Sequence, residues 1–217
     1  MTCMTGQAIF LVVCTANVCR SPAAEILLNR AFQGAGCEGE VRAVSAGVDA
    51  RPGEPMCGQA GGRLGDGTAA HEARSLTVAD LQSASIVLAL DRSHRSACAR
   101  LDPGCRPRLF TLRQAALLAD GVRASVAAGG RPAGSPPLPD DPGERLRWLV
   151  AELDAARADL AGVPEQDLEI VDRHGPDPHA EVVDEIADAT TRLAAAVATV
   201  LAADAGETRP YPHGVRT

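Results

Sequence analysis

The sequence predicts an α/β fold built on a parallel sheet. Two observations support this prediction: apolar runs alternate with helix-like segments, and each run stops at a polar loop before the next helix begins. The first run, Ile9–Val13, ends at Cys14, and apolar residues at helical spacing start from Ala23. A later run, Ser85–Leu90, is almost continuously apolar, as expected of a parallel strand that is covered on both faces.

The other elements follow the same alternation. Residues Ala23–Gln33 have the pattern of a helix that Gly34 ends, and Glu40–Ser45 alternates apolar and polar side chains like a strand. Further along the chain, the patterns predict helices over 55–64, 75–80, 91–100, 144–160 and 180–203, and a short strand, or the start of a helix that ends near 120, over 108–112.

The length of 217 residues is enough for one sizeable core. A Pro- and Gly-rich stretch over 129–143 indicates a loop or linker, and the last residues have the character of a frayed tail. We therefore expect a single domain over 1–203 and a C-terminal tail over 204–217.

The composition argues against several classes of function. The net charge of -7, from 21 Lys and Arg against 28 Asp and Glu, argues against a nonspecific nucleic-acid binder. Aromatic residues make up 2%, too few for a platform that stacks bases. We expect no membrane span and no signal peptide, because the apolar runs are too short. The odd number of cysteines, 7, indicates free or catalytic thiols in a reducing cytoplasm.

The segment between the first strand and the first helix carries the chemistry. Cys14 ends the strand, Arg20 stands six residues later, and Pro22 suits the first turn of the helix. A loop at this place directs backbone N–H groups to one spot at the positive end of the helix dipole, which makes an anion site. The same dipoles and Arg20 stabilise a thiolate at Cys14. The loop therefore combines an anion site, a nucleophile and a bidentate cation.

The run from Cys14 to Pro22, with Asn17 and Cys19 inside it, resembles the phosphate loop of the low-molecular-weight protein tyrosine phosphatase family, whose usual pattern is C-x-G-N-x-C-R-S-P. Outside the loop, the resemblance rests on the turn at Ser45–Gly47, the HEAR segment from His71, the strand over 86–91 with His94 after it, and Asp177–Pro178 before the last helix. The resemblance covers about residues 8–119 and 175–201.

The resemblance implies a three-layer sandwich, in which helices flank a four-stranded parallel sheet of order 2-1-3-4. The phosphate loop lies between the first strand and the first helix. Relative to the compact family core, residues at about 122–171 form an insertion that contains the Pro- and Gly-rich segment and one helix.

The resemblance also implies a cysteine-dependent phosphatase that hydrolyses phosphotyrosine or a related phosphomonoester. Cys14 attacks phosphorus to give a phosphocysteine intermediate, while Arg20 and the loop N–H groups bind the phosphate. Asp177 protonates the leaving group and then activates water, and two other Asp-Pro pairs, at Asp102 and Asp141, are rivals for this role. No metal or other cofactor is needed. The expected phosphate-binding residues are Thr15, Ala16, Asn17, Val18, Cys19, Arg20 and Ser21.

A hydrogen-bond network is expected behind this loop, again by resemblance. Ser21 donates to the Cys14 thiolate, while Asn17, Ser45 and His71 hold the loop in its shape.

The sequence also indicates roles for three other residues in or near the loop. Cys19 is either a redox partner of Cys14, through a transient disulfide that protects the nucleophile, or a small buried thiol. For Asp91 and His94 we expect a helix-capping and a surface position.

Two features depart from the family pattern. Ala16 stands where the family has Gly, which implies strain of about 1 kcal/mol if the backbone there is left-handed. No aromatic residue closely follows Ser45, and His179 replaces the usual Tyr, so the walls that clasp a phosphotyrosyl ring are missing unless Trp148 reaches the site. Val18, in contrast, matches the apolar residue of tyrosine-directed members, whereas Thr there would indicate phosphoarginine.

Two other functions stay open. One is a thiol-linked arsenate reductase that relays oxidation through Cys98 and Cys105, although these cysteines fall later than such a relay places its first. The other is a noncatalytic member that binds phosphoproteins. The expected partners are a phosphorylated protein or a small phosphomonoester and other phosphate-like oxyanions, with no nucleic acid and no membrane. The oligomeric state is left open.

Overall fold

The computed structural model describes residues 7–65, 68, 70–172, 178–203 and 209–210. Its main sheet has four parallel strands in the order β2-β1-β3-β4, which confirms the predicted order. These strands are β1 (Ala8–Cys14), β2 (Val41–Gly47), β3 (Ile86–Ala89) and β4 (Leu109–Thr111). A separate parallel pair consists of β5 (Gly130–Arg131) and β6 (Arg209–Pro210).

The central strand β1 leads directly to the candidate site. It pairs with β2 along its whole length and with β3 from Phe10 to Val13. Phe10 and Val12 point into one core, Leu11 and Val13 into another, and none of the four is more than 2% exposed. Because both faces of the strand are covered, its sequence is an unbroken apolar run, and its polar end falls at Cys14.

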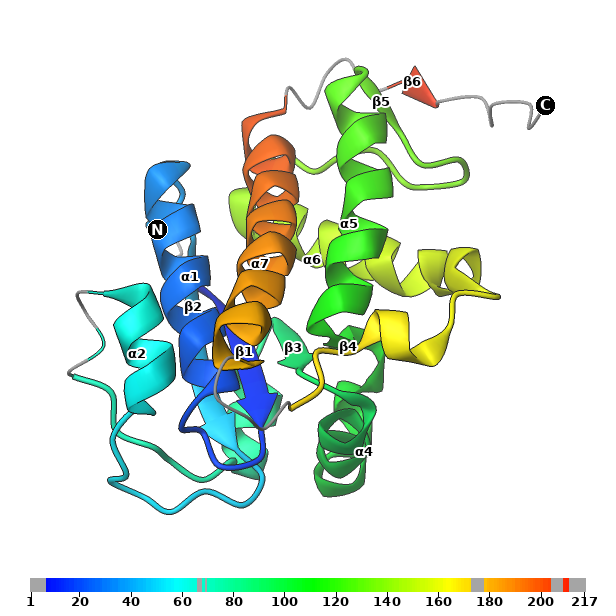
Figure 1. Ribbon diagram of the computed structural model, residues 1–217. Helices are drawn as coiled ribbons and strands as arrows, with labels where there is room; N and C mark the ends of the chain where they lie inside the picture. The colour runs from blue at the N-terminus through cyan, green and yellow to red at the C-terminus, as the bar shows by residue number, and fades with distance from the viewer. Residues whose placement is uncertain (1–6, 66–67, 69, 173–177, 204–208, 211–217) are drawn as a thin grey trace.

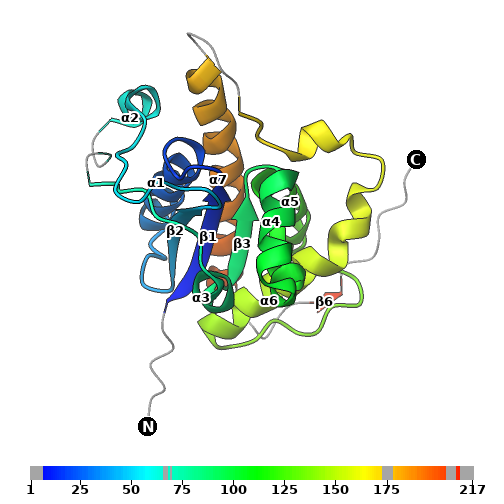
Figure 2. The same ribbon diagram turned by 90° about the horizontal axis from the view of Figure 1, so that it is seen from below.

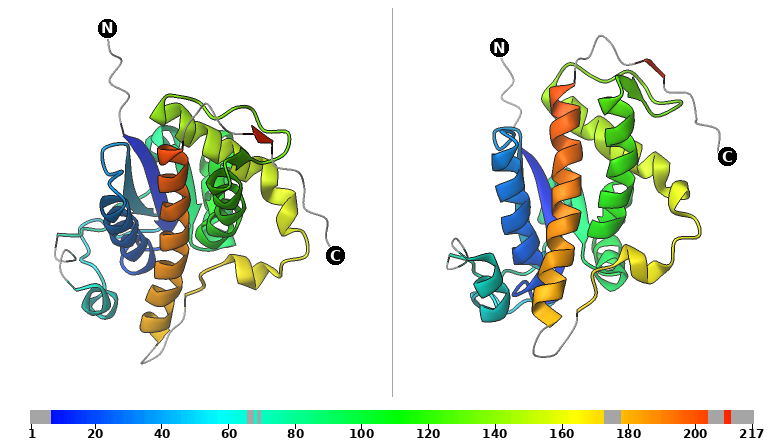
Figure 3. Two further views of the ribbon diagram at one scale, coloured as in Figure 1. Left: turned by 90° about the horizontal axis from the view of Figure 1, so that it is seen from above. Right: turned by 45° about the horizontal axis from the view of Figure 1, so that its top comes forward.

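Helices cover both faces of the sheet and give the predicted three layers. Figure 1 shows α7 between α1 and α5, and the right panel of Figure 3 shows these three helices side by side on one face. Figure 2 shows α3 on the opposite side of the sheet, where α4 and the 3-10 turn η1 also pack. The helices and turns are α1 (Arg20–Gly34), α2 (Gly58–Leu64), α3 (Val78–Ser83), α4 (Arg92–Leu101), η1 (Pro103–Arg108), α5 (Leu112–Ala127), α6 (Pro142–Ala155), η2 (Ala156–Leu160), η3 (Glu165–Leu168) and α7 (Pro178–Ala202).

None of the described helices combines the length and the apolar character that crossing a membrane requires.

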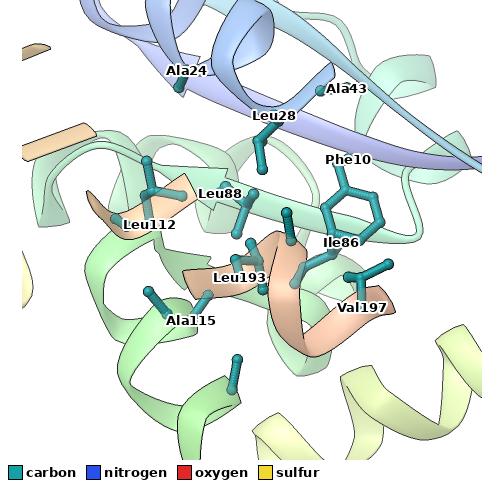
Figure 4. Packing of buried hydrophobic residues seen from close by; sticks show 14 of the residues in the cluster. Phe10, Ala24, Leu28, Ala43, Ile86, Leu88, Leu112, Ala115, Leu193 and Val197 are labelled. Atoms are coloured by element: carbon teal, nitrogen blue, oxygen red, sulfur yellow. The ribbon is translucent and has the colours of Figure 1, made fainter. Parts of the chain in front are cut away.

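The larger core fixes the sheet against the three long helices. Figure 4 shows Leu88 of β3 among Leu28 of α1, Leu112 of α5 and Leu193 of α7, and all four side chains are 0% exposed. Burying a side chain of this size contributes roughly 1.5–3 kcal/mol. The carboxyl ends of the strands, where the site lies, therefore stand on a rigid base.

Capping side chains fix the helix starts at the edge of the sheet. Asp91 caps α4, as predicted, by accepting from the N–H groups of Ser93 (2.9 Å) and His94 (3.2 Å). Thr77 and Thr111 begin α3 and α5 with capping boxes, in which the third helical residue bonds back to the cap. Since α4 and α5 follow β3 and β4 directly, their starts lie at the same edge as the end of β1.

The outer edge of β2 is partly covered by a side chain. Asn29 of α1 accepts from the Ala43 N–H through Oδ1 at 2.8 Å and donates through Nδ2 to the Ala43 carbonyl O at 3.0 Å. Farther along this edge, the Gly47 N–H donates to Arg74 O at 2.9 Å, and Gly47 O accepts from the Leu76 N–H at 2.8 Å.

The residues after α5 pack mainly against α5 and α7. Helix α5 continues to Ala127, so position 122, where the insertion was expected to start, falls inside a helix. Trp148 of α6 is 5% exposed, and its Nε1 donates to Pro136 O at 3.1 Å. Trp148 is thus a core residue and does not supply an aromatic wall at the loop. The helix expected over 144–160 changes to the tighter turn η2 at Ala156, from which Arg157 donates to Leu109 O at 2.9 Å.

The chain then returns to the sheet before α7 begins. The Ile170 N–H donates to Leu90 O at 2.8 Å, one residue beyond β3, and the Thr111 hydroxyl donates to Leu168 O. In Figure 1 this gold segment runs toward the carboxyl ends of β1 and β3. Residues 168–172 therefore reach the edge of the sheet where Cys14 lies.

Candidate active site

The loop that carries the predicted chemistry joins the end of β1 to the start of α1. Cys14 is the last residue of β1 and is 3% exposed, whereas Arg20 is the first residue of α1 and is 5% exposed. Cys19, at the N-cap, makes no capping hydrogen bond through its side chain. The first N–H groups of α1 thus have no cap from Cys19 and lie at the positive end of the helix dipole, where an anion binds favourably.

The candidate nucleophile has a hydroxyl partner. Cys14 Sγ lies 2.9 Å from Ser21 Oγ in the first turn of α1. Ser21 Oγ also accepts from Asn17 Nδ2 at 3.0 Å, so its own proton can be donated either to the sulfur or to the more distant Ala46 O at 3.5 Å. The Ser21 hydroxyl and the N-terminus of α1 thus both lie beside the sulfur of Cys14.

Asn17 holds the middle of the loop. Among the described residues it alone, apart from glycines, has a positive φ, 59°, and it is completely buried. Its Nδ2 donates to Ser45 Oγ at 2.8 Å, its Oδ1 accepts from the Arg74 N–H at 2.9 Å, and its carbonyl O lies 2.7 Å from His71 Nε2. Asn tolerates the left-handed conformation better than most residues, and these hydrogen bonds offset the backbone strain that remains at Asn17. Asn17, Ser45 and His71 therefore lie together, and their role in holding the loop stays a prediction.

A carboxylate that the sequence analysis did not single out completes this network. Ser45 Oγ donates to Glu25 Oε2 at 2.5 Å, so the lone pairs of Ser45 are free to accept from Asn17. Glu25 lies four residues after Ser21 and therefore on the same face of α1, which is the sequence signal that points to it.

Gly47 allows the loop to lie against the end of β2, where it is paired with Cys14. A Cβ at position 47 would lie 2.5 Å from Thr15 O and 2.9 Å from the carbonyl carbon of Ala16. The next residue, Val48, donates from its N–H to Cys14 O at 3.0 Å. A side chain at position 47 would thus displace the loop.

Ala16 does not have the left-handed backbone that would make it strained. The left-handed residue of the loop is its neighbour Asn17, since no other non-glycine residue in the described ranges has a positive φ. The strain expected at Ala16 is therefore absent.

Arg20 is held by carboxylates from two other segments. Its Nη1 donates to Asp91 Oδ2 at 3.1 Å and to Ile170 O at 3.2 Å, and its Nη2 donates to Asp172 Oδ2 at 3.3 Å. The side chain of Asp172 is 43% exposed, against 16% for Asp91. A phosphate that reaches Arg20 would therefore displace Asp172 more easily than Asp91.

Asp177, the acid expected from the sequence, lies outside the described residues. Asp172, five residues earlier, lies at the Arg20 end of the loop, and sequence reasoning missed it because no Pro follows it. The two rivals have other contacts: Asp102 and Asp141 accept hydrogen bonds from N–H groups two and three residues further on, at helix starts.

His94 is buried, so the expected surface position was wrong. It is 1% exposed, and its Nε2 lies 2.8 Å from Thr15 Oγ1. Its Nδ1 lies 3.0 Å from Asp91 Oδ1, but the direction is not that of a well-aligned hydrogen bond, so the contact is mainly electrostatic. Burial raises the pKa of Asp91, but contacts with His94 and Ser93 outweigh this and hold that pKa well below its usual range.

Cys19 lies beside a second cysteine. The Cys57 N–H donates to Val18 O at 2.8 Å. Burial, and after it the neighbouring Cys57 thiol, raise the pKa of Cys19 well above its usual value. Both thiols are free, and the pairing of Cys19 with Cys14 stays a prediction.

Cys98 and Cys105, on which the reductase alternative depends, are completely buried between the sheet and the α4–η1 layer. Burial raises the pKa of Cys98 to about 12. Cys14 belongs to the core on the other face of the sheet. A thiol relay from Cys14 to these two residues would need this part of the fold to open.

The surroundings of the loop are aliphatic rather than aromatic. The aromatic side chains in the described part are all buried, at 5% exposure or less: Phe10, Phe32, Phe110 and Trp148. Two exposed valines instead adjoin the loop: Val48 follows Gly47, and Val171 lies between Ile170 and Asp172. In the same ranges, no three His, Cys, Asp or Glu side chains are grouped to hold a metal ion.

A parallel sheet whose central strand ends in a cysteine–arginine anion loop defines the class of small cysteine-dependent phosphatases. The family model described as "low molecular weight phosphotyrosine protein phosphatase" matches residues 9–118, and the chain belongs to this family.

Relatives in the family differ in the substrate that their names give. A protein-arginine-phosphatase of Bacillus subtilis (strain 168) is 35% identical over 106 residues, which are 48% of this chain and 69% of that protein. The probable low molecular weight protein-tyrosine-phosphatase EpsP of Ralstonia nicotianae is 30% identical over 105 residues, which are 47% of this chain and 68% of that protein.

Two solved structures show the same fold. A mutant of YwlE from Bacillus subtilis aligns with a TM-score of 0.58 at 22% identity and covers 87% of this chain and 97% of its own. The tyrosine phosphatase AmsI of Erwinia amylovora aligns with a TM-score of 0.56 at 19% identity and covers 89% of this chain and 95% of its own.

Proposed function

We propose that this chain hydrolyses phosphomonoesters through a phosphocysteine intermediate on Cys14. The observation that carries the proposal is the position of Cys14 Sγ, 2.9 Å from Ser21 Oγ, in a loop whose other end is Arg20 at the N-terminus of α1. A nucleophilic thiolate and a phosphate-binding cation thus share one loop of seven residues.

The loop first has to neutralise its substrate, because a phosphate dianion repels an anionic nucleophile. Loop N–H groups and the planar fork of Arg20 supply this charge compensation. The thiolate then attacks phosphorus in line, so that an S–P bond forms while the P–O bond to the leaving group breaks. Water later attacks the phosphocysteine, releases phosphate and returns the thiolate.

The leaving oxygen needs a proton, and Asp172 is the acid that we favour. In the unliganded site its carboxylate neutralises Arg20 at 3.3 Å. A phosphate that replaces it at Arg20 leaves the Asp172 carboxyl beside the leaving oxygen, to which it can pass a proton. Asp177, as expected from the sequence, is the second candidate.

Phosphotyrosine is the substrate that the family favours, and Val18 agrees with it. Phosphoarginine, in which the P–N bond would break and the leaving nitrogen would take the proton, is a second candidate, because the arginine-directed relative is 35% identical in the matched region and the residues exposed beside the loop are aliphatic. Either group can belong to a phosphorylated protein. A cytoplasmic location, expected from the cysteine content, stays a prediction.

The test is a panel of p-nitrophenyl phosphate, a phosphotyrosyl peptide and a phosphoarginyl peptide with the wild type and Cys14→Ser. We expect turnover by the wild type and a loss of at least about 1,000-fold in the variant, because the thiolate is the attacking group. Cys37→Ser, at a buried cysteine outside the loop, is the matched control and keeps full turnover. Equal rates in the wild type and Cys14→Ser would exclude the mechanism.

A further inference from the structure

We propose that His94 is a positioning residue that holds the two ends of the phosphate loop in a fixed relation to each other. The inference rests on the proposed phosphate-binding role of this loop and assigns a function to a side chain outside it.

A continuous chain of contacts crosses the site. Thr15 Oγ1, beside the nucleophile, lies 2.8 Å from His94 Nε2, and His94 Nδ1 lies 3.0 Å from Asp91 Oδ1. Asp91 Oδ2 then accepts from Arg20 Nη1 at 3.1 Å. His94 and Asp91 thus connect the first residue after Cys14 with the arginine at the far end of the loop.

The middle and the far end of this chain of contacts are buried, whereas Thr15 is exposed. His94 is 1% exposed and Arg20 is 5% exposed. Asp91 uses its two oxygens for different tasks, since Oδ1 caps α4 and Oδ2 binds Arg20. Because Asp91 and His94 both lie at the first turn of α4, a shift of that turn would move both ends of the loop together.

The partners of His94 also indicate its tautomer. The carboxylate beside Nδ1 favours a proton on that nitrogen, which leaves Nε2 to accept from the Thr15 hydroxyl. His94 is too far along this chain of contacts to touch the reacting atoms, so its effect is on phosphate binding through Thr15 and Arg20. Its loss should therefore raise the dissociation constant of phosphate and KM by the same factor, with little change in kcat.

Two conservative variants separate the two contacts. The side-chain amide of Asn reaches about as far as Nδ1, and that of Gln about as far as Nε2. His94→Asn therefore keeps the Asp91 contact and loses Thr15, whereas His94→Gln keeps Thr15 and loses Asp91. Thr15→Val removes the hydroxyl alone. We expect each of the three to raise the dissociation constant of inorganic phosphate, measured by calorimetry on the full chain, about fivefold.

A double-mutant cycle gives the decisive readout. Thr15→Val should have no further effect in His94→Asn, in which that contact is already gone, but should still weaken phosphate binding in His94→Gln. Cys98→Ala is the control for packing: it lies one turn further along α4 and is completely buried, so it should lower Tm and leave phosphate binding unchanged.

The inference is overturned if Thr15→Val weakens phosphate binding equally in the wild type and in His94→Asn, or if the His94 variants change only Tm, as Cys98→Ala does. If the wild type itself does not bind phosphate, the proposed function of the loop fails and this inference fails with it. If Cys14→Ser abolishes turnover but the effects of Thr15→Val and His94→Asn on phosphate binding are additive, the proposed function of the loop stands and only the proposed role of His94 fails.

Discussion

The carboxylate of Asp172 lies 3.3 Å from Nη2 of Arg20, although 152 positions separate the two residues in the sequence. The segment that makes this contact is held at the sheet by the bond from the Ile170 N–H to Leu90 O. The residues between α5 and α7 therefore do more than pack outside the core, because they end in a segment that supplies a carboxylate to the anion loop.

The contact between Asp172 and Arg20 makes Asp172 a candidate general acid beside Asp177. Asp172→Asn should lower kcat for phenyl phosphate, whose leaving group needs a proton, by about 100-fold or more. It should lower kcat much less for p-nitrophenyl phosphate, whose leaving group is stable as an anion. Asp177→Asn is the matched control and should change either rate by less than about threefold. The reverse pattern would return the role of acid to Asp177.

The close approach at Gly47 predicts a large effect of one methyl group. Because a Cβ there would lie 2.5 Å from Thr15 O, Gly47→Ala should lower the free energy of unfolding by about 1–3 kcal/mol and weaken phosphate binding. Gly62→Ala on α2, where nothing lies within 4 Å of the added Cβ, should instead leave stability equal or raise it by up to about 1 kcal/mol. Urea denaturation measures the free energy of unfolding of both variants. Similar free energies for Gly47→Ala and Gly62→Ala would show that the loop moves aside for the added methyl group at little cost.

The low pKa of Asp91 predicts how stability depends on pH. Because contacts with His94 and Ser93 outweigh burial and lower this pKa in the folded state, Asp91 stabilises the fold above its unfolded pKa of about 3.9. That contribution is lost as the pH falls through the still lower folded value. The wild type should therefore exceed Asp91→Asn in stability by about 1–3 kcal/mol at pH 6, and the difference should shrink between pH 4 and pH 2.

Urea denaturation across that pH range checks the prediction for Asp91. Asp159→Asn, at an exposed residue of η2, serves as the control, and its difference from the wild type should stay near zero throughout. A difference for Asp91→Asn that does not depend on pH would contradict the assigned cause.

The raised pKa of Cys19 predicts slow alkylation. At pH 8 the folded protein should carry very little Cys19 thiolate, because burial and the Cys57 contact both oppose it. Iodoacetamide should then label Cys19 at least about tenfold more slowly in the folded protein than in urea. Peptide mass spectrometry measures the labelling, and equal rates in the two states would rule out the proposed environment.

The parts of the site that follow one another along the chain were predictable. The strand before Cys14, the loop and the helix after it are local, so their apolar run, their spacing and Pro22 indicate them directly. Asn17, Ser45 and His71 come from distant segments, and only the family resemblance brought them together in advance.

Contacts that depend on tertiary packing were not predictable. His94 was expected at the surface, but α4 turns its His94 and Cys98 side toward the sheet, which buries the ring beside Thr15. Asp172 carries no recognisable motif, and its importance depends on how the segment after η3 returns to β3. Helix α1 begins at Arg20, three residues before its expected start. Arg20 and Ser21 therefore belong to the helix and to the loop at the same time.

The paired hydrogen bonds between Asn29 and Ala43 have a consequence for the behaviour of the protein at high concentration. An uncovered outer strand can recruit a strand from a second copy and start ordered aggregation. The side-chain amide already satisfies both polar groups of Ala43, so an approaching strand finds its ladder interrupted in the middle of β2. One helical side chain thus blocks strand addition at Ala43 and at the same time anchors α1, the helix on which the anion loop ends.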